Sequence, residues 1–561
     1  MRSGPTIPSR GRANGAPAVR SNLLLACLAV LMSGAVGCVP SSVDGSVDLT
    51  GRPVRMTFLH TSDTHARVYD YTFDPSFTDN GLGLQDDSGP YGGLAEIAYI
   101  LRRERQNAGR VLHFDSGDSF QGAVVFNEFG GEVEFRALSA AGLDGAVVAN
   151  HEFDLGARNL ADMVLGHAGF PLLAANYDFQ NSDLAWATQL EDYVLPTMIY
   201  DVDGLRVGII GMANLSSLNS LDEQLNSLGI RVLDVGDVIP ARAAELKAAG
   251  AELIVVVSHM GMDDDKEMAR QFGDIDIILG GHHHVALDPP LVVVNEATGK
   301  EIPVVHSGAF AKFVGRLDVV VQDGEVLSHD YRLFAVDNTV PKDPVVEEIL
   351  EEYRLRLQTD YALEQAIAYA EVQLNRYGSG GGDSALGNFT AEAMRSFPGV
   401  ETEIALTNTL GIRADIPAGN ITIDTLFNAM PFDNTITTMF LSGREVQELL
   451  DYVAFRSSER GCSSQAQVAG IEFVMDCGIR AARDIRINGA PLDPSGTYEL
   501  ATNNYIAHGG SGFEVLERNT TQVDTGISIR DVVQAAMIRY GTLPQVDIGV
   551  CVEDGRIQPV F

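Results

Sequence analysis

The chain has 561 residues and a formal net charge of −37, with 45% hydrophobic and 20% charged residues. This length predicts two large domains, and the balance of hydrophobic and charged residues excludes a disordered chain. So acidic a protein is a poor partner for nucleic-acid polymers or anionic membranes through its overall field. An anionic substrate would therefore require a locally positive site, made by metal ions or by arginine.

The amino-terminal segment predicts export. Residues 1–37 contain four arginines and no acid, and their apolar run at 23–36 is too short to span a bilayer comfortably. We predict a signal peptide at 1–37 and a tether at 38–53. The sequence "AVGC" resembles a bacterial lipobox ending at Cys38, although Ala35 stands where Leu is usual. An uncleaved amphipathic anchor is the alternative.

The predicted location is therefore the periplasm or the outer membrane or surface of a bacterium. Membrane attachment is expected only through lipid on Cys38, and no protein partner is evident. In an oxidising compartment the remaining cysteines, Cys462, Cys477 and Cys551, can form a disulfide. A Cys462–Cys477 bond would close a 15-residue loop, worth about 3 kcal/mol in the chain-entropy model. The sequence does not fix the pairing, and one thiol is left over.

Between residues 54 and about 335, short apolar runs such as "AELIVVVSHM" alternate with segments such as "LAEIAYILRRERQ". Segments of the second kind have apolar residues three and four positions apart, the spacing of one face of a helix. Alternating strands and helices are typical of an α/β fold. Almost every apolar run ends in Asp, His or Asn. Ligand groups gather at the carboxyl ends of strands in such folds, which directs attention to these endings.

Two further segments complete the predicted organisation. Residues 343–370 are predicted to form one long helix within a linker at 341–370, and this helix is a candidate hinge. The linker would join a first domain at 54–340 to a second domain of mixed helices and strands at 371–555.

Seven polar side chains at the ends of the apolar runs are candidate metal ligands. In an extended chain, side chains two residues apart point to the same face. Asp63 and His65 would therefore share one face, and so would His282 and His284. Nitrogen and oxygen ligands without a thiolate suit borderline divalent ions. Seven ligands exceed one ion but suit two ions that share a bridge, as in phosphoryl displacement. The candidates are Asp63, His65, Asp118, Asn150, His259, His282 and His284.

Each of these residues has an ordinary structural interpretation when taken alone. Asp63 can cap a helix, His259 can be a satisfied core histidine, and Asn150 can serve a turn. The histidines at 282–284 can face solvent. Their coincidence at successive strand ends favours the metal site.

The series "HTSDTH", "SGDSF", "NHEFD", "SHMG" and "GGHHH" resembles the calcineurin-like metallophosphoesterase pattern. More narrowly, it resembles the 5′-nucleotidase and bacterial UDP-sugar hydrolase family over nearly all of residues 54–550. The resemblance implies an α/β protein: a layered α/β/β/α sandwich followed by an α+β 5′-nucleotidase domain. Ala66 stands where the family usually has Gly.

The resemblance also implies the roles of the site residues. Two divalent ions, Zn, Mn, Fe or Co, would share Asp118 as a bridge. His151 would stabilise the transition state or protonate the leaving oxygen, with its ring oriented by Asp154. The implied ligands are Asp63, His65, Asp118 and His284 for one ion, and Asp118, Asn150, His259 and His282 for the other.

The second domain resembles the family at "LGNFTAEAMR", "TNTLGIRADIPAGNIT", "MPFDNTI" and "NYIAHGGSGF". The resemblance implies that Arg413 grips the substrate phosphate, for which a guanidinium fork is suited. Phe432 and Tyr505 would sandwich a base, a contact worth roughly 1–3 kcal/mol per base. Asn408 would contact the substrate, and Arg376 is the one arginine close to the place where the family binds phosphate.

Departures from the family concentrate in this domain. Ser511 stands where an Asp usually holds the ribose hydroxyls, and Leu410 and Asp433 each replace a Gly. The predicted function is hydrolysis of 5′-nucleotides to nucleoside and phosphate, with rotation of the second domain during loading. Nucleotide sugars, cyclic nucleotides and sulfur esters are alternative substrates on the same centre. A non-catalytic surface binding protein and a metal-storage or structural lipoprotein are alternatives of another class.

Overall fold

The computed structural model of the protein describes residues 49–73, 75–181, 185–214 and 230–561. The predicted signal peptide, Cys38 and most of the predicted tether lie outside these residues. Within the described part of the chain, no helix combines the length and the apolar character needed to cross a bilayer.

Two β-sheets form the centre of the first domain. The first sheet has seven strands: β1 (Val54–Thr61), β2 (Val111–Asp115), β3 (Gly145–Val147), β4 (Leu172–Leu173), β6 (Val194–Leu195), β14 (Phe313–Gln322) and β15 (Glu325–Ala335). The second has six: β7 (Thr197–Val202), β8 (Leu205–Met212), β10 (Leu253–Ser258), β11 (Ile277–Gly280), β12 (Leu291–Val294) and β13 (Glu301–His306). Their orders are β15-β14-β1-β2-β3-β4-β6 and β12-β13-β11-β10-β8-β7.

The main core of this domain lies between the two sheets. Phe58 and Phe114 of the first sheet and Val255 and Leu279 of the second belong to one buried cluster. Because successive strand residues point to opposite faces, each sheet also presents a second face to helices. The cluster around Ile254 and Val256 packs beneath the helices of the second sheet.

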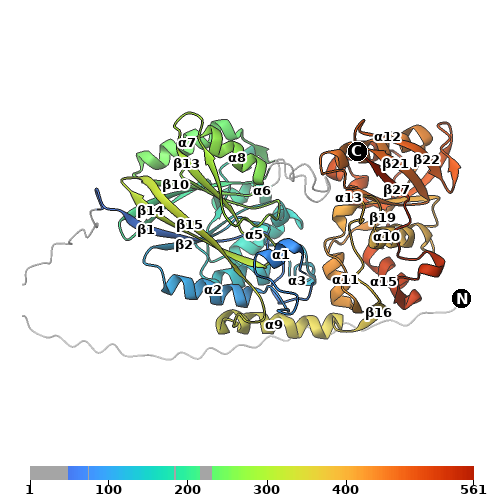
Figure 1. Ribbon diagram of the computed structural model, residues 1–561, viewed down its shortest axis with the longest axis horizontal. Coiled ribbons are helices and arrows are strands. Elements are labelled where there is room, and N and C mark those ends of the chain that lie inside the picture. Colours follow the sequence, from blue (N-terminus) through green and yellow to red (C-terminus); the bar gives the residue numbers. More distant parts are fainter. Residues whose placement is uncertain (1–48, 74, 182–184, 215–229) are drawn as a thin grey trace, which may run out of the picture. The chain divides into compact units, whose positions relative to one another are not determined.

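Helices cover the outer faces of both sheets. Figure 1 shows α7 (Val235–Ala248) and α8 (Met262–Gln271) on one side and α2 (Leu94–Gln106) on the other. α2 buries Leu94, Ile97 and Leu101 on one face. The remaining helices and strands of this domain are α1 (Phe77–Gly81), α3 (Val124–Phe129), α4 (Glu132–Ala141), α5 (Gly156–His167), α6 (Ala185–Gln189), β5 (Tyr177–Asp178) and β9 (Arg231–Val232). The predicted α/β/β/α sandwich is confirmed.

The long helix predicted at 343–370 is wrong in its last third. α9 (Pro344–Tyr361) begins at Asp343, whose side chain accepts hydrogen bonds from two backbone amides, and ends where Ala362 takes φ of +48°. Residues Ala366–Ala370 form strand β16 instead. The buried residues of this strand, Ile367 and Ala370, are three positions apart, whereas a regular strand buries every second residue. A register irregularity between Ala366 and Ala368 accompanies this spacing. The spacing of the buried pair therefore imitates a helix.

The second domain contains three sheets, so it has the predicted α+β character. The five-stranded sheet comprises β17 (Ile404–Asn408), β19 (Thr435–Ser442), β20 (Ala466–Ala469), β24 (Thr497–Asn503) and β25 (Val523–Ser528). The others comprise β21 (Ile471–Asp476), β22 (Ala481–Ile487), β23 (Ala490–Pro491) and β27 (Ile557–Val560), and β16 with β18 (Gly419–Thr422) and β26 (Thr542–Leu543). The helices are α10 (Ala385–Ser396), α11 (Ile423–Ala429), α12 (Gly443–Ser458), α13 (Asn504–Ala507), α14 (Glu514–Glu517) and α15 (Ile529–Tyr540).

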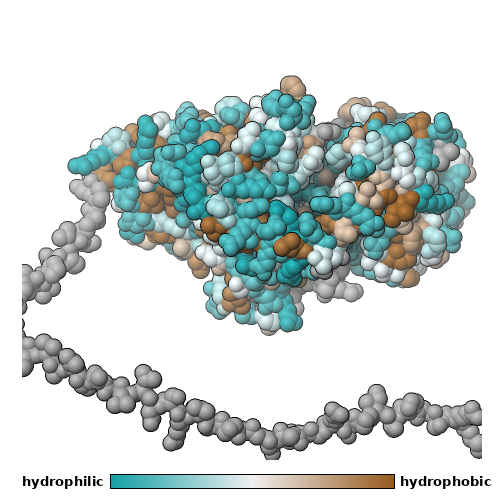
Figure 2. Space-filling view, turned by 90° about the horizontal axis from the view of Figure 1, so that it is seen from below, coloured by the Kyte–Doolittle hydropathy of each residue, from teal (hydrophilic) through white to brown (hydrophobic). Residues whose placement is uncertain are grey.

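Two cores lie on opposite faces of the five-stranded sheet. Ile404 and Leu406 of β17 pack in the cluster that contains α12, whereas Ala405 between them packs with α10 and α15. This alternation is the period-two pattern of a strand that is buried on both faces. On the face drawn in Figure 2, hydrophilic residues cover most of the left part of the molecule, and apolar residues gather toward its right end.

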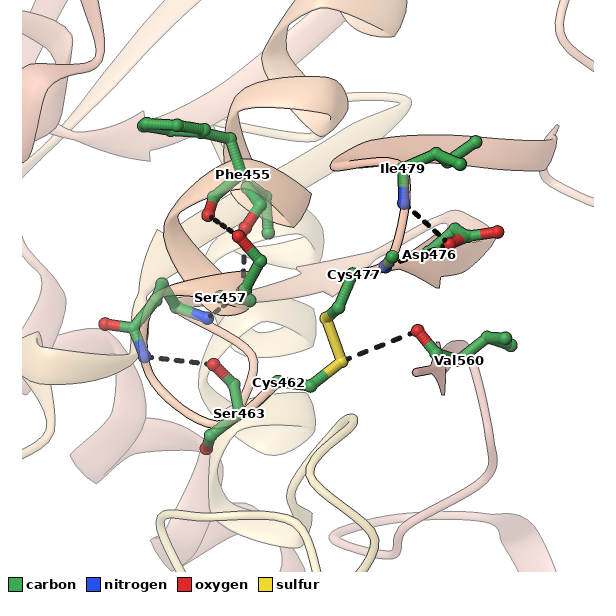
Figure 3. Close-up of a disulfide and its surroundings, with 12 residues drawn as sticks. Phe455, Ser457, Cys462, Ser463, Asp476, Cys477, Ile479 and Val560 are labelled. Carbon is green, nitrogen blue, oxygen red and sulfur yellow. Dashed lines mark hydrogen bonds between the residues drawn. A yellow bond between two sulfur atoms is a disulfide. The ribbon is translucent and has the colours of Figure 1, made fainter.

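A disulfide joins Cys462 to Cys477. Figure 3 shows it beside β27, where the carbonyl oxygen of Val560 lies 3.8 Å from Cys462 Sγ. The sequence left the pairing open, and the structure leaves Cys551 as a free, buried thiol.

Candidate metal centre

The predicted ligands follow five strands, each within four residues of the strand end. β1, β2 and β3 are parallel neighbours, and so are β10 and β11. Parallel strands bring their carboxyl ends to one edge of a sheet, so the loops that follow them meet. These loops carry Asp63 and His65 after β1, Asp118 after β2, Asn150 after β3, His259 after β10, and His282 and His284 after β11.

The backbone at these ligands is not extended, so the predicted shared faces are the wrong explanation of their arrangement. Left-handed φ values occur at five of the seven, which are Asp63 (+50°), His65 (+49°), Asp118 (+55°), His282 (+75°) and His284 (+57°). Residues other than glycine rarely adopt this region, and such strain clusters at functional sites. Tight turns therefore aim these side chains. Ala66 also takes a positive φ of +55°, which accounts for glycine being the usual residue there.

Six of the seven ligands form overlapping groups with His151. The nitrogen and oxygen atoms within each group lie close enough to hold one ion between them. Asp118 belongs to two of these groups. The three groups are Asp63, His65 and His284; His65, Asp118 and His151; and Asp118, His259 and His282.

The distances join these groups into one centre. His65 Nε2 lies 2.9 Å from His284 Nε2, and His284 Nε2 lies 3.6 Å from Asp63 Oδ1. His259 Nε2 lies 3.0 Å from Asp118 Oδ2, outside hydrogen-bond geometry, and 3.9 Å from Asp63 Oδ1. Glycine permits this crowding, because a Cβ at Gly281 would lie 3.0 Å from Asp63 Oδ2 and 3.1 Å from His259 Nδ1.

Two buried polar atoms of the centre have no hydrogen-bond partner among the described residues. They are Asn150 Oδ1 and His259 Nε2. An unsatisfied buried polar atom costs about 1–3 kcal/mol unless a ligand satisfies it. Both atoms are of the kind that coordinates a borderline divalent cation. The residues present therefore fit a metal ion.

Backbone carbonyls orient two of the histidines. His65 Nδ1 donates to the carbonyl oxygen of Gln121 over 2.9 Å, and His259 Nδ1 donates to that of Ser116 over 2.7 Å. Since a carbonyl only accepts, the proton of each ring is on Nδ1. The Nε2 lone pairs are therefore directed to the centre, the usual arrangement for a ligating histidine.

Burial sets the charge of the centre. It lowers the pKa of His65 and His284 well below the ordinary value and that of His282 to about 3, so these rings are neutral at neutral pH. Burial alone would raise the pKa of Asp118, but the charges of His259 and His151 bring it well below its usual range. Burial alone would lower the pKa of His259, yet Asp118 raises it to about 10, so a cation that binds Nε2 must displace a second proton from this ring. Asp118 is therefore ionised at neutral pH and attracts a positive charge to the centre.

Glu152 is a residue that sequence analysis missed. Its buried carboxylate accepts hydrogen bonds from the backbone N–H groups of Ala149 (2.8 Å), Ser119 (2.8 Å), Asp118 (3.2 Å) and Phe120 (3.3 Å). It therefore fixes the loops that carry Asp118 and Asn150. The signal was present within "NHEFD", between His151 and Asp154.

His151 begins the 3₁₀ helix η1 (His151–Phe153) at the edge of the centre. Its Nδ1 lies 2.7 Å from Asp154 Oδ2, and its backbone N–H donates to Asp118 Oδ1 over 2.9 Å. Burial alone would lower the pKa of His151, but Asp154 and Asp118 raise it above the ordinary value. This geometry suits a proton donor oriented by a carboxylate.

Two of the five predicted substrate-contacting residues approach the metal centre. Arg413 Nη2 lies 3.3 Å from His65 Nε2, and its guanidinium carbon lies 5.8 Å from the centre of the Phe432 ring. The Phe432 ring is in turn 6.2 Å from that of His151. A cation and an aromatic face from the second domain therefore stand beside the candidate ligands.

The other three residues lie in contacts within the second domain. Asn408 Oδ1 accepts a hydrogen bond from Asn503 over 2.7 Å, and the Tyr505 hydroxyl lies 3.3 Å from Ser511 Oγ. The guanidinium of Arg376 donates to the backbone carbonyl of Arg413. The structure thus gives Arg376 a supporting contact behind Arg413.

Residues that sequence analysis missed hold the segment around Phe432. From the first domain, Arg67 donates to Asn428, and Asn127 Nδ2 donates to the carbonyl of Pro431 over 2.9 Å. From α15, Arg530 donates to the carbonyl of Phe432. These contacts depend on tertiary structure, and the sequence offers no spacing signal for them.

Comparison with known proteins decides the family. The model for calcineurin-like phosphoesterases matches residues 56–286, and that for the 5′-nucleotidase C-terminal domain matches residues 366–518. The crystal structure of the 5′-nucleotidase precursor from Thermus thermophilus is 30% identical, covering 90% of this chain and 99% of that one with a TM-score of 0.80. This chain belongs to the 5′-nucleotidase family. It is therefore a phosphoric monoester hydrolase of the metallophosphoesterase type, and such enzymes use divalent metal ions.

Two further proteins show how far the similarity in sequence and in fold extends. The snake venom 5′-nucleotidase of Gloydius brevicauda is 28% identical over 516 residues, which is 84% of each chain. The sulfate thiohydrolase of T. thermophilus is 20% identical with a TM-score of 0.73, and at that identity it shares the fold alone.

Proposed function

We propose that this phosphoesterase hydrolyses 5′-nucleotides to nucleoside and inorganic phosphate on two divalent cations. One observation carries the proposal: six of the seven candidate ligands lie in three overlapping groups, which share His65 and Asp118. The 5′-nucleotidases from T. thermophilus and G. brevicauda, which resemble this chain over most of its length, support the nucleotide as substrate.

The first cation would be held by Asp63, His65, Asp118 and His284, and the second by Asp118, Asn150, His259 and His282. The unpartnered Asn150 Oδ1 supports including an asparagine in the second set. When bound, two such cations polarise the phosphoryl oxygens and make water a nucleophile at neutral pH. Zn, Mn, Fe and Co all suit these ligands.

His151 would serve the leaving group. With Nδ1 directed to Asp154 over 2.7 Å, the proton that His151 can release in its charged form is on Nε2. Delivery of that proton to the ester oxygen would balance the charge that develops as the bond to phosphorus breaks. Asp154 acts through His151, so it is a positioning residue.

The second domain would bind the two ends of the nucleotide. Arg413 donates in a fork geometry that matches phosphate oxygens, and Arg376 holds the carbonyl of Arg413. Phe432 and Tyr505 offer faces for a base, and Asn408 offers an amide. The nearness of Arg413 to His65 supports a phosphate that lies between this arginine and the cations.

Chromatographic analysis of the products formed from a panel of substrates, with phosphate release measured for the monoesters and sulfate release for the sulfur ester, tests this proposal. We expect AMP to be hydrolysed with a higher kcat/KM than UDP-glucose, a cyclic nucleotide, an aryl phosphate or a thiosulfate adduct. Activity should disappear with a chelator and return with Zn²⁺ or Mn²⁺. Preference for the sulfur ester, or binding of AMP without turnover, would overturn the proposal.

We also propose that the chain is exported, cleaved before Cys38 and lipidated there, and that it is divided into domains at 54–340 and 371–555 around a linker. The family matches at 56–286 and 366–518 support this division. The disulfide supports an oxidising compartment. Mass spectrometry of the mature amino terminus tests the cleavage, and a Cys38→Ser variant should leave the membrane fraction.

A further inference from the structure

A cavity of about 310 Å³ opens between α10 and α15 of the second domain. It shares no lining residue with the candidate metal centre. Its volume is at the lower end of the range for small-molecule sites, so a ligand with one or two rings would fill it. The cavity is therefore a candidate for a function that the phosphoesterase reaction does not use.

Most of the cavity wall is apolar and aromatic. Phe389, Phe397 and Tyr540 contribute rings, and the Phe389 and Tyr540 ring centres lie 6.1 Å apart in an edge-to-face arrangement. Val532 and Cys551 are buried in the same wall. Burial raises the pKa of the Cys551 thiol to about 12, so the thiol is neutral and adds to the apolar surface. This wall suits a flat apolar body.

One buried polar atom of the wall lacks a partner. Asn388 is 3% exposed, and its Nδ2 donates to Asp383 Oδ2 over 2.6 Å and to the carbonyl of Val552 over 2.9 Å. Because both partners are acceptors, the orientation of the amide is determined. Asn388 Oδ1 accepts no hydrogen bond from the described residues. Because this oxygen is itself covered, a ligand with a hydrogen-bond donor would satisfy it only after a small shift of the cavity wall.

The charged groups of the wall favour an anion. Glu392 pairs with Arg395, and Arg556 pairs with Asp554. Arg539 has no ion pair among the described residues, and its guanidinium carbon lies 5.5 Å from the Tyr540 ring centre. Its side chain is exposed at the rim of the cavity. It offers a charge-assisted contact to a carboxylate.

We infer that this cavity is a second ligand site, separate from the metal centre, for a small aromatic carboxylic acid that carries one hydrogen-bond donor. The apolar wall would hold the ring system, Asn388 the donor, and Arg539 the carboxylate. The site goes beyond the proposed hydrolysis, since none of these groups contacts the candidate ligands or Arg413.

Calorimetric titration of the purified protein with indole-3-propionate tests this inference. We expect saturable binding with one molecule per chain and no competition from AMP. Arg539→Gln should weaken binding about tenfold, the loss of one charge-assisted contact. Arg444→Gln, which changes an exposed arginine on α12 outside the cavity, should leave binding unchanged. Ala536→Phe should fill the cavity and abolish binding while the thermal midpoint stays near that of the wild type.

Two related probes separate the features of the ligand. Indole lacks the carboxylate and 1-naphthalenepropionate lacks the N–H group, so both should bind more weakly than indole-3-propionate. Absence of saturable binding below millimolar concentration, binding that AMP displaces, or equal affinity of wild type and Arg539→Gln would overturn the inference. If Ala536→Phe fails to fold, Arg539→Gln still tests the inference, because a substitution at an exposed residue should leave the fold intact.

Discussion

The candidate ligands of the first domain and the predicted substrate-contacting residues of the second are positioned in different ways. The ligands stand within four residues of strand ends and are gathered by parallel strands. In the second domain, Arg413 and Phe432 come from loops and reach the centre through contacts such as Arg67 to Asn428. Sheet geometry thus positions the candidate metal ligands, while contacts between distant residues position the predicted substrate-contacting residues. Changes in the two regions should therefore have separable effects.

The largest effect is expected from Asp118→Ala. This carboxylate is common to two candidate ligand groups, so its loss would remove the proposed bridge between two cations. Several kcal/mol of transition-state stabilisation would be lost, which lowers kcat on the order of 10⁴-fold. Metal content and AMP hydrolysis should fall together. Asp162→Asn, a change at an exposed carboxylate on α5, should alter neither, and an active Asp118→Ala variant would break the account.

His151→Ala should lower kcat about 10³-fold, the contribution of a positioned proton donor. Its metal content should equal that of the wild type, because His151 is assigned to the leaving group. Asp154→Asn should have a smaller effect in the same direction. A fall in metal content of His151→Ala would show that the ring is a ligand, and His167→Ala on the exposed part of α5 is the matched control.

Arg413→Ala should lower kcat/KM for AMP about 10²-fold, mainly through a higher KM, because a fork of charged donors to phosphate is lost. Arg413→Lys should recover part of this loss, since an ammonium keeps the charge and not the fork. Metal content should stay unchanged in both. If it changes, the separation between the two regions fails. Arg444→Ala serves as the control for arginine removal.

Glu152→Gln sharpens the comparison within the first domain. The variant keeps the shape but weakens four hydrogen bonds that fix the loops of Asp118 and Asn150. Metal affinity should fall about tenfold, the lower end for residues that orient ligands. The signature is activity that excess Zn²⁺ or Mn²⁺ restores. If excess metal does not restore the activity of this variant, the role of Glu152 in orienting the ligand loops is contradicted.

Glu134→Gln should leave the rate unchanged and alter only stability. Glu134 is fully buried, neither of its oxygens has a hydrogen-bond partner among the described residues, and burial raises its pKa from 4.5 to about 8. The folded state therefore keeps a proton that the unfolded chain loses. The stability contribution of this group is complete below pH 4.5 and falls as pH rises to about 8. The variant should gain thermal stability over the wild type at pH 8 but not at pH 4.5. An equal difference at both pH values would refute the assignment.

The sequence was sufficient for features that depend on local order. Apolar runs ending in Asp, His or Asn predicted an α/β fold and six candidate ligands that the structure brings into overlapping groups, while the layered sandwich was implied by the family resemblance. The sequence was insufficient at Ile367 and Ala370, because a spacing of three residues fits one face of a helix and also this irregular strand. It was also insufficient for the left-handed turns at Asp63 and His282, because residue type alone does not reveal such strain. Arg67 acts through a distant partner, which no spacing predicts. Glu152 lies inside a quoted motif, but the motif does not show that its carboxylate accepts hydrogen bonds from backbone N–H groups.

A count of metal per chain most directly tests the central idea that these seven side chains hold a pair of cations. The purified protein is stripped with a chelator, reloaded with Zn²⁺ or Mn²⁺, and analysed for metal and phosphate release together. We expect activity to rise with occupancy to two equivalents per chain, and His284→Ala to retain about one. Full activity of the wild type at one equivalent, or with no metal, would contradict the account.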